Sequence, residues 1–183
     1  MKQLIDSGKQ WQLSSFWAWI QSWFSVASTN ECSKCYCGKT NLNFVIGGIK
    51  TGVNKYPWMA ILLHDNKFKC GASLINDRYV LTLATYVDEY NKQGTIKNLT
   101  VRLLEHDRSM DTETTLIDRQ VQSILLHSSF ADKRNVEGDI ALVKFTEPVK
   151  LIGILRPVCL PTPGFNYSGI DGVVTGWGTQ YYK

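Results

Sequence analysis

Short apolar runs separated by turn residues fill the chain from residue 45 onward, and this pattern restricts it to a sheet-rich fold. The runs lie at 58–63, 79–83, 99–104, 121–126 and 140–145, and a further strand is predicted at 172–178. Each has the length of a strand, and the glycine, asparagine and aspartate residues between the runs favour tight turns. Several short strands with frequent turns predict an all-β sandwich or barrel.

The first 36 residues have a different composition. Residues 10–30 carry no formal charge and hold four of the six tryptophans. Phe16, Ile20, Trp23 and Ala27 follow helical spacing, so we expect a short amphipathic helix. A degenerate signal or signal-anchor and a disordered segment are the alternatives. Membrane association through this helix is a weaker interpretation, because polar residues break the apolar stretch and the polar face lacks lysine and arginine.

The charges and cysteines limit the classes of partner. The net charge is +4 and the basic residues are scattered, which argues against a nucleic-acid-binding surface. Five cysteines leave at least one thiol unpaired if the protein is secreted. Cys32 and Cys35 form a CxxC pair with no second pair at zinc spacing, so a disulfide-rich linker is favoured and no metal site is expected.

Two Asn-x-Ser/Thr sequences indicate an extracellular protein. Asn98 begins Asn-Leu-Thr and Asn166 begins Asn-Tyr-Ser. Both lie in polar surroundings, and such sequences are acceptors for N-linked glycans in secreted proteins. We therefore expect a secreted chain, although its N-terminal segment is atypical of a signal peptide.

Six segments, in the right order, resemble the chymotrypsin/trypsin-family serine protease domain. They are Val-Ile-Gly-Gly at 45–48, Tyr-Pro-Trp-Met at 56–59, Cys-Gly-Ala-Ser-Leu-Ile at 70–75, Gly-Asp-Ile-Ala-Leu-Val at 138–143, Arg-Pro-Val-Cys-Leu-Pro at 156–161 and Val-Thr-Gly-Trp-Gly at 174–178. The resemblance covers residues 37–180, and the segment 37–41 is similar to arthropod trypsin-like proteases.

This resemblance implies a double β-barrel with an essentially complete first barrel. Residues 45–149 would form that barrel, 150–171 the connector between barrels, and 172–183 the first strand of a truncated second barrel. Before them would come a pro-segment at 37–44 and, at 1–36, the N-terminal amphipathic region with its Cys-rich linker.

The family's catalytic triad is only partly matched. Asp139 stands at the position of the catalytic aspartate, whereas Thr85 occupies the position of the histidine in the segment Leu-Thr-Leu-Ala-Thr-Tyr at 81–86. A threonine hydroxyl cannot accept a proton near neutral pH, so general-base catalysis is expected to be lost. We interpret Asp139 as a buried carboxylate satisfied by backbone donors.

No other residue of the chain is expected to complete the catalytic triad. His64 lies in a turn-like segment, His106 in a charged loop, and His127 after an apolar strand where the family places a surface histidine, so none is expected to replace the missing base. The Gly-Asp-Ser-Gly-Gly motif that carries the family's serine does not occur in these 183 residues.

The resemblance also makes predictions for the cysteines. Cys37 and Cys159 match the pair that ties the pro-segment to the catalytic domain, so we expect that disulfide. Tyr86 replaces the cysteine that would pair with Cys70, which leaves Cys70 unpaired. Losing a native disulfide typically costs a small secreted domain about 2–5 kcal/mol.

The family's activation site is not matched by this sequence. The family has arginine or lysine before its new N-terminus, whereas Phe44 precedes Val45 here, which leaves a chymotrypsin-like cleavage as the alternative.

The segment from Glu105 to Glu113 resembles the family's calcium loop, and Asp107, Asp111 and Glu113 supply oxygen ligands. Solvated loop charges are the favoured interpretation, and no cofactor is expected.

Three hypotheses follow. A non-catalytic homologue would act as a binding module, decoy or cofactor towards protein partners or peptide substrates of an extracellular protease cascade. Alternatively, the chain is an incomplete sequence of an active secreted serine endopeptidase. The third hypothesis is that no stable protein accumulates, because an unpaired apolar strand favours aggregation.

Overall fold

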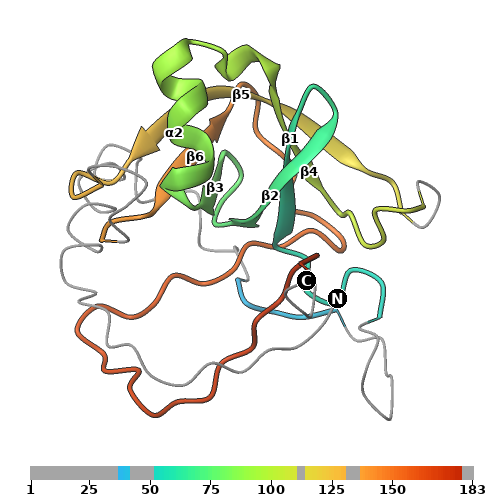
Figure 1. Ribbon diagram of the computed structural model, residues 1–183. Coiled ribbons are helices and arrows are strands. Elements are labelled where there is room, and N and C mark those ends of the chain that lie inside the picture. Colours follow the sequence, from blue (N-terminus) through green and yellow to red (C-terminus); the bar gives the residue numbers. More distant parts are fainter. Residues whose placement is uncertain (1–36, 42–51, 111–113, 131–136, 179–183) are drawn as a thin grey trace.

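The computed structural model describes residues 37–41, 52–110, 114–130 and 137–178. The predicted N-terminal helix within 1–36, the Phe44–Val45 site, and Asp111 and Glu113 lie outside these residues. Six antiparallel strands close into one barrel in the order β1-β2-β3-β6-β5-β4 (Figure 1). The closed all-β barrel predicted from the sequence is therefore confirmed.

Five of the six strands overlap the predicted runs, whereas the strand at 67–74 was not among them. The barrel strands are β1 Met59–His64, β2 Lys67–Leu74, β3 Tyr79–Thr82, β4 Leu99–Leu103, β5 Ile117–Leu126 and β6 Ala141–Phe145. Asp65 and Asn66 connect β1 to β2 with φ of 48° and 61°. A two-residue turn with both residues at positive φ matches the right-handed twist of paired strands, and Asp and Asn tolerate that conformation.

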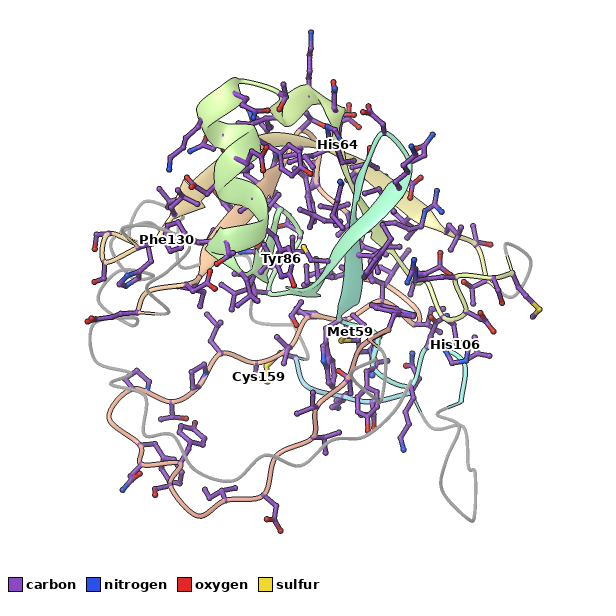
Figure 2. All side chains as sticks on the ribbon, in the orientation of Figure 1. Met59, His64, Tyr86, His106, Phe130 and Cys159 are labelled. Atoms are coloured by element: carbon purple, nitrogen blue, oxygen red, sulfur yellow. A yellow bond between two sulfur atoms is a disulfide. The ribbon has the colours of Figure 1, made fainter. Side chains whose placement is uncertain are left out.

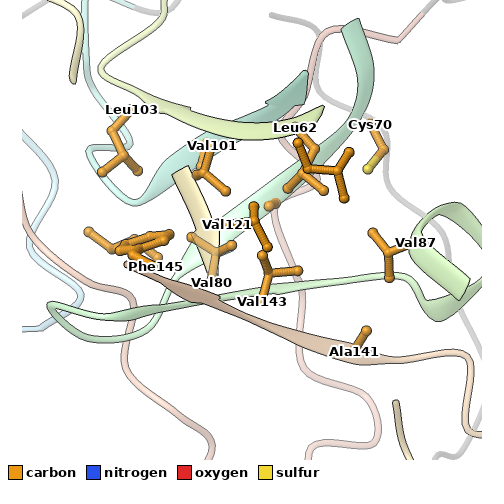
Figure 3. Packing of buried hydrophobic residues seen from close by; sticks show 14 of the residues in the cluster. Leu62, Cys70, Val80, Val87, Val101, Leu103, Val121, Ala141, Val143 and Phe145 are labelled. Carbon is orange, nitrogen blue, oxygen red and sulfur yellow. The ribbon is translucent and has the colours of Figure 1, made fainter. Parts of the chain in front are cut away.

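One apolar core fills the barrel. Phe145, Leu62 and Leu103 are fully buried, and Cys70 and Val87 lie at the end of the cluster where the helix packs (Figure 3). Truncating one such leucine to alanine typically costs about 2–5 kcal/mol. The barrel is thus the stable scaffold on which the residues of the candidate site are placed.

Helix α2, Ala84–Gln93, is the main element that the periodicity of the sequence did not predict. The helix ends at residues 91–94, where Gly94 has φ 67° and its N–H donates to the Asn91 carbonyl. Glycine in this conformation is a common helix terminator. The short helix η1, Ile96–Asn98, then leads into β4.

The strand predicted at 172–178 is not formed. These residues carry no strand assignment, and Val173 and Val174 are more than half exposed. In the part of the chain that the structure describes, no strand pairs with this segment. A strand needs a neighbour to satisfy its backbone groups. Two side-chain contacts hold the segment instead: Thr175 lies 2.9 Å from the Met59 sulfur, and Trp177 donates to the His106 carbonyl.

The first part of the connector packs against the barrel. Cys159 forms the predicted disulfide with Cys37, and Gly38 donates its backbone N–H to Pro157. Val158 donates to Leu74, and Leu155 is buried. Residues 160–174, by contrast, are almost wholly exposed. None of the helices among the described residues is long and apolar enough to span a membrane.

Candidate functional site: an aspartate held by threonine

Asp139 and Thr85, which are 54 residues apart in the sequence, meet at the start of helix α2. The Thr85 backbone N–H donates to Oδ1 of Asp139 at 2.7 Å, and the Thr85 hydroxyl donates to Oδ2 at 2.6 Å. Both side chains are partly buried. A carboxylate that accepts from a hydroxyl and an N–H makes short, charge-assisted hydrogen bonds.

This contact explains where the helix begins. The N-cap residue, Leu83, makes no side-chain capping bond, and the first turn of α2 contains no acidic residue. The first N–H groups of a helix lack partners within the helix and favour a negative charge nearby. Asp139 provides both an acceptor and a negative charge from the segment before β6, so it caps the helix through a tertiary contact.

The same contact determines what the pair can do chemically. Within the described residues, both hydrogen bonds of the Asp139 carboxylate come from Thr85. A general base needs an acceptor atom that gains a proton near neutral pH, which an imidazole offers and a hydroxyl does not. The arrangement therefore holds a hydroxyl, and not an imidazole, against the carboxylate.

Two of the three histidines contact other parts of the protein. His64 ends β1, where its ring stacks on Tyr90 with centroids 4.6 Å apart and its Nδ1 lies 3.5 Å from Asp65. His106 lies in the loop after β4, at the end of the barrel opposite His64 (Figure 2), and its backbone carbonyl accepts from Trp177. That none of the three histidines replaces the missing base stays a prediction.

His127 is buried rather than at the surface, which corrects the sequence-based interpretation. It is only 6% exposed, and its Nδ1 accepts the backbone N–H of Ser129 at 3.1 Å. Its own backbone N–H donates to the Ile140 carbonyl. The residue thus packs inside the turn that precedes Asp139 and helps to position it.

Gly138 allows its own backbone to pass close to residues 127–130. It has φ +68°, and a Cβ at this position would lie 2.9 Å from His127 Nδ1 and from backbone atoms of Ser129 and Phe130. Only glycine fits a left-handed backbone with so little space. Sequence reasoning quoted Gly138 as part of a motif but did not recognise that it positions Asp139.

Cys70 is a buried free thiol. Its sulfur lies 3.5 Å from the Thr82 hydroxyl oxygen, and that hydroxyl donates to the Gly71 carbonyl at 2.9 Å. Burial raises the pKa of the Cys70 thiol, an effect that the Thr82 contact partly opposes. A protonated buried thiol packs as a small apolar side chain. Tyr86, at the position of the missing cysteine, is 49% exposed.

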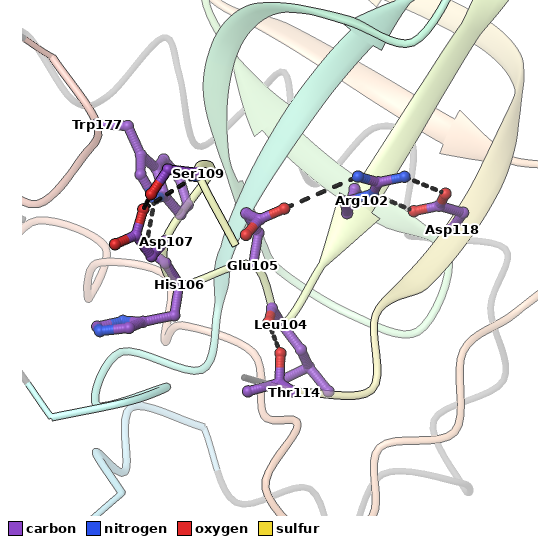
Figure 4. A network of polar contacts seen from close by, with 9 residues as sticks. All are labelled: Arg102, Leu104, Glu105, His106, Asp107, Ser109, Thr114, Asp118 and Trp177. Atoms are coloured by element: carbon purple, nitrogen blue, oxygen red, sulfur yellow. Dashed lines mark hydrogen bonds and ion pairs between the residues drawn. The ribbon is translucent and has the colours of Figure 1, made fainter. Parts of the chain in front are cut away.

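The described residues of the loop that resembles a calcium site, 105–110, make contacts within the protein. Arg102 pairs with Asp118 through two hydrogen bonds of 2.8 and 2.9 Å and lies 3.8 Å from the buried Glu105 (Figure 4). Asp107 accepts both the backbone N–H and the hydroxyl of Ser109. Among the described residues, no group of three potential ligands could hold a metal ion.

The comparisons with known proteins agree with this architecture. Residues 45–183 match the family described as Trypsin. The chain is 32% identical over 161 residues to venom serine protease 34 of Apis mellifera, covering 84% of this chain and 39% of that protein. It is also 32% identical to CLIP domain-containing serine protease B9 of Anopheles gambiae, covering 78% and 40% of the two. Vitamin K-dependent protein C of Rattus norvegicus is 35% identical over 144 residues, covering 76% and 30%.

These relatives are considerably longer than the region they share with this chain, which spans from 30% to 40% of their lengths. Two of the three come from arthropods, in agreement with the resemblance at residues 37–41. The family match covers most of the chain and includes the whole barrel. The chain therefore belongs to the trypsin family of serine proteases.

Proposed function

We propose that this chain is a non-catalytic trypsin-family homologue that works by binding proteins in an extracellular protease cascade. The observation that carries the proposal is the Thr85–Asp139 contact. The carboxylate that would orient a catalytic imidazole accepts a threonine hydroxyl at 2.6 Å and a backbone N–H at 2.7 Å. In the fold, Asp139 caps the N-terminus of helix α2.

Loss of the base has a large effect on the chemistry of this family. The imidazole takes the proton from the attacking serine and returns it to the leaving amine. General acid–base catalysis of this kind contributes about 10²–10⁴-fold to rate. A serine supplied by any further segment would face Thr85 and Asp139, and neither side chain can perform both proton transfers.

A role in a cascade is supported by the names of two relatives. One is called Spaetzle-processing enzyme of Drosophila melanogaster and is 32% identical over 169 residues. Another is the CLIP domain-containing protease already described. A chain that keeps the barrel of such proteins but lacks the base would be able to occupy their partners without cleaving them.

The catalytic half of the proposal is tested with the full chain secreted from insect cells. Fluorogenic peptides ending in arginine, lysine or phenylalanine and an active-site phosphonate probe are applied beside an active trypsin-family protease. We expect no turnover or labelling above a mock preparation. Turnover that copurifies with the folded chain would refute the proposal.

The binding half needs a separate measurement. The folded chain is titrated into the cleavage of a protease zymogen by an active trypsin-family protease from the same animal. We expect a change in cleavage rate that saturates, and heat-unfolded chain serves as the control. An unchanged rate at every concentration would contradict a binding role in that reaction.

Sequencing distinguishes this proposal from the alternative, in which the chain is an incomplete sequence of an active secreted endopeptidase. The transcript is read across codon 85 and beyond codon 183. Histidine at position 85 together with a downstream Gly-Asp-Ser-Gly-Gly motif would favour the active enzyme. Threonine at 85 in independent transcripts supports the non-catalytic homologue.

A further inference from the structure

The exposed part of the connector contains a small turn with its own hydrogen bonds. The Phe165 N–H donates to Thr162, and the Thr162 N–H donates to the Tyr167 hydroxyl at 2.8 Å. The rings of Phe165 and Tyr167 meet edge to face with centroids 4.6 Å apart. The turn is thus held together locally, although it lies in a stretch that packs little against the barrel.

Asn166 lies between Phe165 and Tyr167 in the sequence, at the start of Asn-Tyr-Ser. Its side-chain oxygen, Oδ1, accepts the backbone N–H of Ser168 at 2.9 Å. Asn166, Tyr167 and Ser168 are all exposed. Because the amide oxygen makes the turn contact, the amide nitrogen Nδ2 is left on the exposed side, and this nitrogen is the atom to which an N-linked sugar is attached.

The second sequon, at Asn98, has a different environment. Asn98 ends η1, its N–H donates to Thr95, and its carbonyl accepts the N–H of Asp65. Leu99 is fully buried, and Thr100 lies in β4, where it pairs with residues of β1 and β5. In the folded barrel Leu99 and Thr100 are part of β4 and Asn98 is half-buried, so this sequon is less accessible to a modifying enzyme than the one at Asn166.

We propose that Asn166 carries an N-linked glycan and that Asn98 does not. This inference rests on the extracellular location in the proposed function. In the reaction, Nδ2 forms a bond to the anomeric carbon of an oligosaccharide linked to a polyprenyl pyrophosphate. The sugar–phosphate bond breaks, the lipid pyrophosphate leaves, and one amide proton is released to solvent.

The glycan also has a physical effect at this position. Phe165 is 51% exposed, Tyr167 38% and Ile170 57%, all within four residues of Asn166. Exposed apolar side chains of this kind favour association between molecules. A bulky, hydrated sugar attached next to these exposed side chains makes this part of the connector more soluble.

The test compares the full chain with single variants in a eukaryotic secretory system. Asn166→Gln and Ser168→Ala each remove the acceptor sequence, and Ser168→Thr keeps it. Asn98→Gln is the matched control at the other sequon. Glycosylation is read as a mobility shift that is removed by an amidase converting the modified asparagine to aspartate, and the converted residue is located by peptide mass spectrometry.

We expect one glycan, lost in Asn166→Gln and Ser168→Ala but kept in Ser168→Thr and Asn98→Gln. A shift that persists in Asn166→Gln, a glycan on Asn98, or a secreted chain without any glycan would overturn the proposal.

A second experiment distinguishes failure of this inference from failure of the extracellular proposal. In it, the residues before Cys32 are replaced by an established cleavable signal peptide. If Asn166 is modified only when this signal peptide is present, the acceptor site is supported and export by the chain's own N-terminus is contradicted. If the chain is secreted in both experiments with Asn166 unmodified, the acceptor site is overturned and the extracellular location is still supported.

Discussion

Thr85 donates its backbone N–H to one carboxylate oxygen of Asp139 and its hydroxyl to the other, at 2.7 and 2.6 Å. The contact joins the first turn of α2 to the segment before β6 across 54 residues. It satisfies an N–H that the helix itself leaves without a partner. Asp139 thereby contributes to folding, and its contribution is measurable as stability.

Replacing Asp139 by asparagine should destabilise the fold by about 1.5–3 kcal/mol, the usual range for hydrogen bonds to a charged group. The neutral amide keeps one acceptor oxygen but places an N–H₂ group against a Thr85 donor. Urea denaturation followed by circular dichroism measures the change. Asp171→Asn, at an exposed position in the connector, is the control and should change stability little. Equal stability of both variants would contradict the capping role.

Replacing Thr85 by valine should cost less, because the backbone N–H bond to Asp139 remains and only the hydroxyl is lost. We expect about 1–2 kcal/mol, given that one charge-assisted hydrogen bond is removed. Thr85→Ser keeps the hydroxyl and should lie within about 0.5 kcal/mol of the native chain, as substitutions without such a loss usually do. A valine variant as stable as the serine variant would show that the hydroxyl contributes nothing.

Gly138→Ala should be among the most damaging single-methyl changes in the barrel. The added Cβ would lie 2.9 Å from backbone atoms of Ser129 and Phe130, at φ +68°. Left-handed backbone costs an alanine about 1–2 kcal/mol before any clash is counted, so a loss above about 2 kcal/mol is expected. Gly172→Ala is the matched control, because nothing lies within 4 Å of its Cβ. Similar melting temperatures for the two would refute this role.

Tyr86→Cys should form a disulfide with Cys70, as the family resemblance implies. Closing a loop of about 15 residues stabilises a fold by about 3 kcal/mol in the chain-entropy account. Peptide mapping without reductant detects the bond, and thermal unfolding with and without reductant measures its effect. Tyr86→Ser removes the ring without adding a thiol and is the control. Two free thiols in the oxidised variant would contradict the prediction.

Stability should fall at alkaline pH in a way that depends on Cys70. Burial raises the pKa of this thiol above its value in the unfolded chain. The unfolded chain therefore loses its proton first, and the contribution of Cys70 is complete below the unfolded pKa and lost as the pH rises towards the folded one. Urea denaturation at a series of pH values measures the slope.

Cys70→Ala removes the titrating group and should reduce this alkaline slope. The native thiol should also react with iodoacetamide far more slowly than in urea, as judged by mass spectrometry of the Cys70 peptide. An unchanged slope in the alanine variant, or rapid alkylation of the folded chain, would argue against a buried protonated thiol.

Local patterns in the sequence were sufficient to predict most strands of the barrel. Strand-length apolar runs and the Asp65-Asn66 turn predict β1, β3, β4, β5 and β6, because alternation and turn preference act over a few residues. The family motifs predict the Cys37–Cys159 disulfide and place threonine at the position of the base. These features depend on residue identity and spacing alone.

Tertiary contacts decided the features that the sequence did not predict. Helix α2 has no local signal at its start, since its cap is a carboxylate supplied from 54 residues away. His127 is buried because the turn closed by Gly138 folds over it, and residues 172–178 do not form a strand because no described strand lies beside them. The sequence by itself determined that threonine, and not histidine, stands at position 85. Only the three-dimensional structure decided that Asp139 caps a helix, because hydrogen bonds between distant segments exist only after the chain has folded.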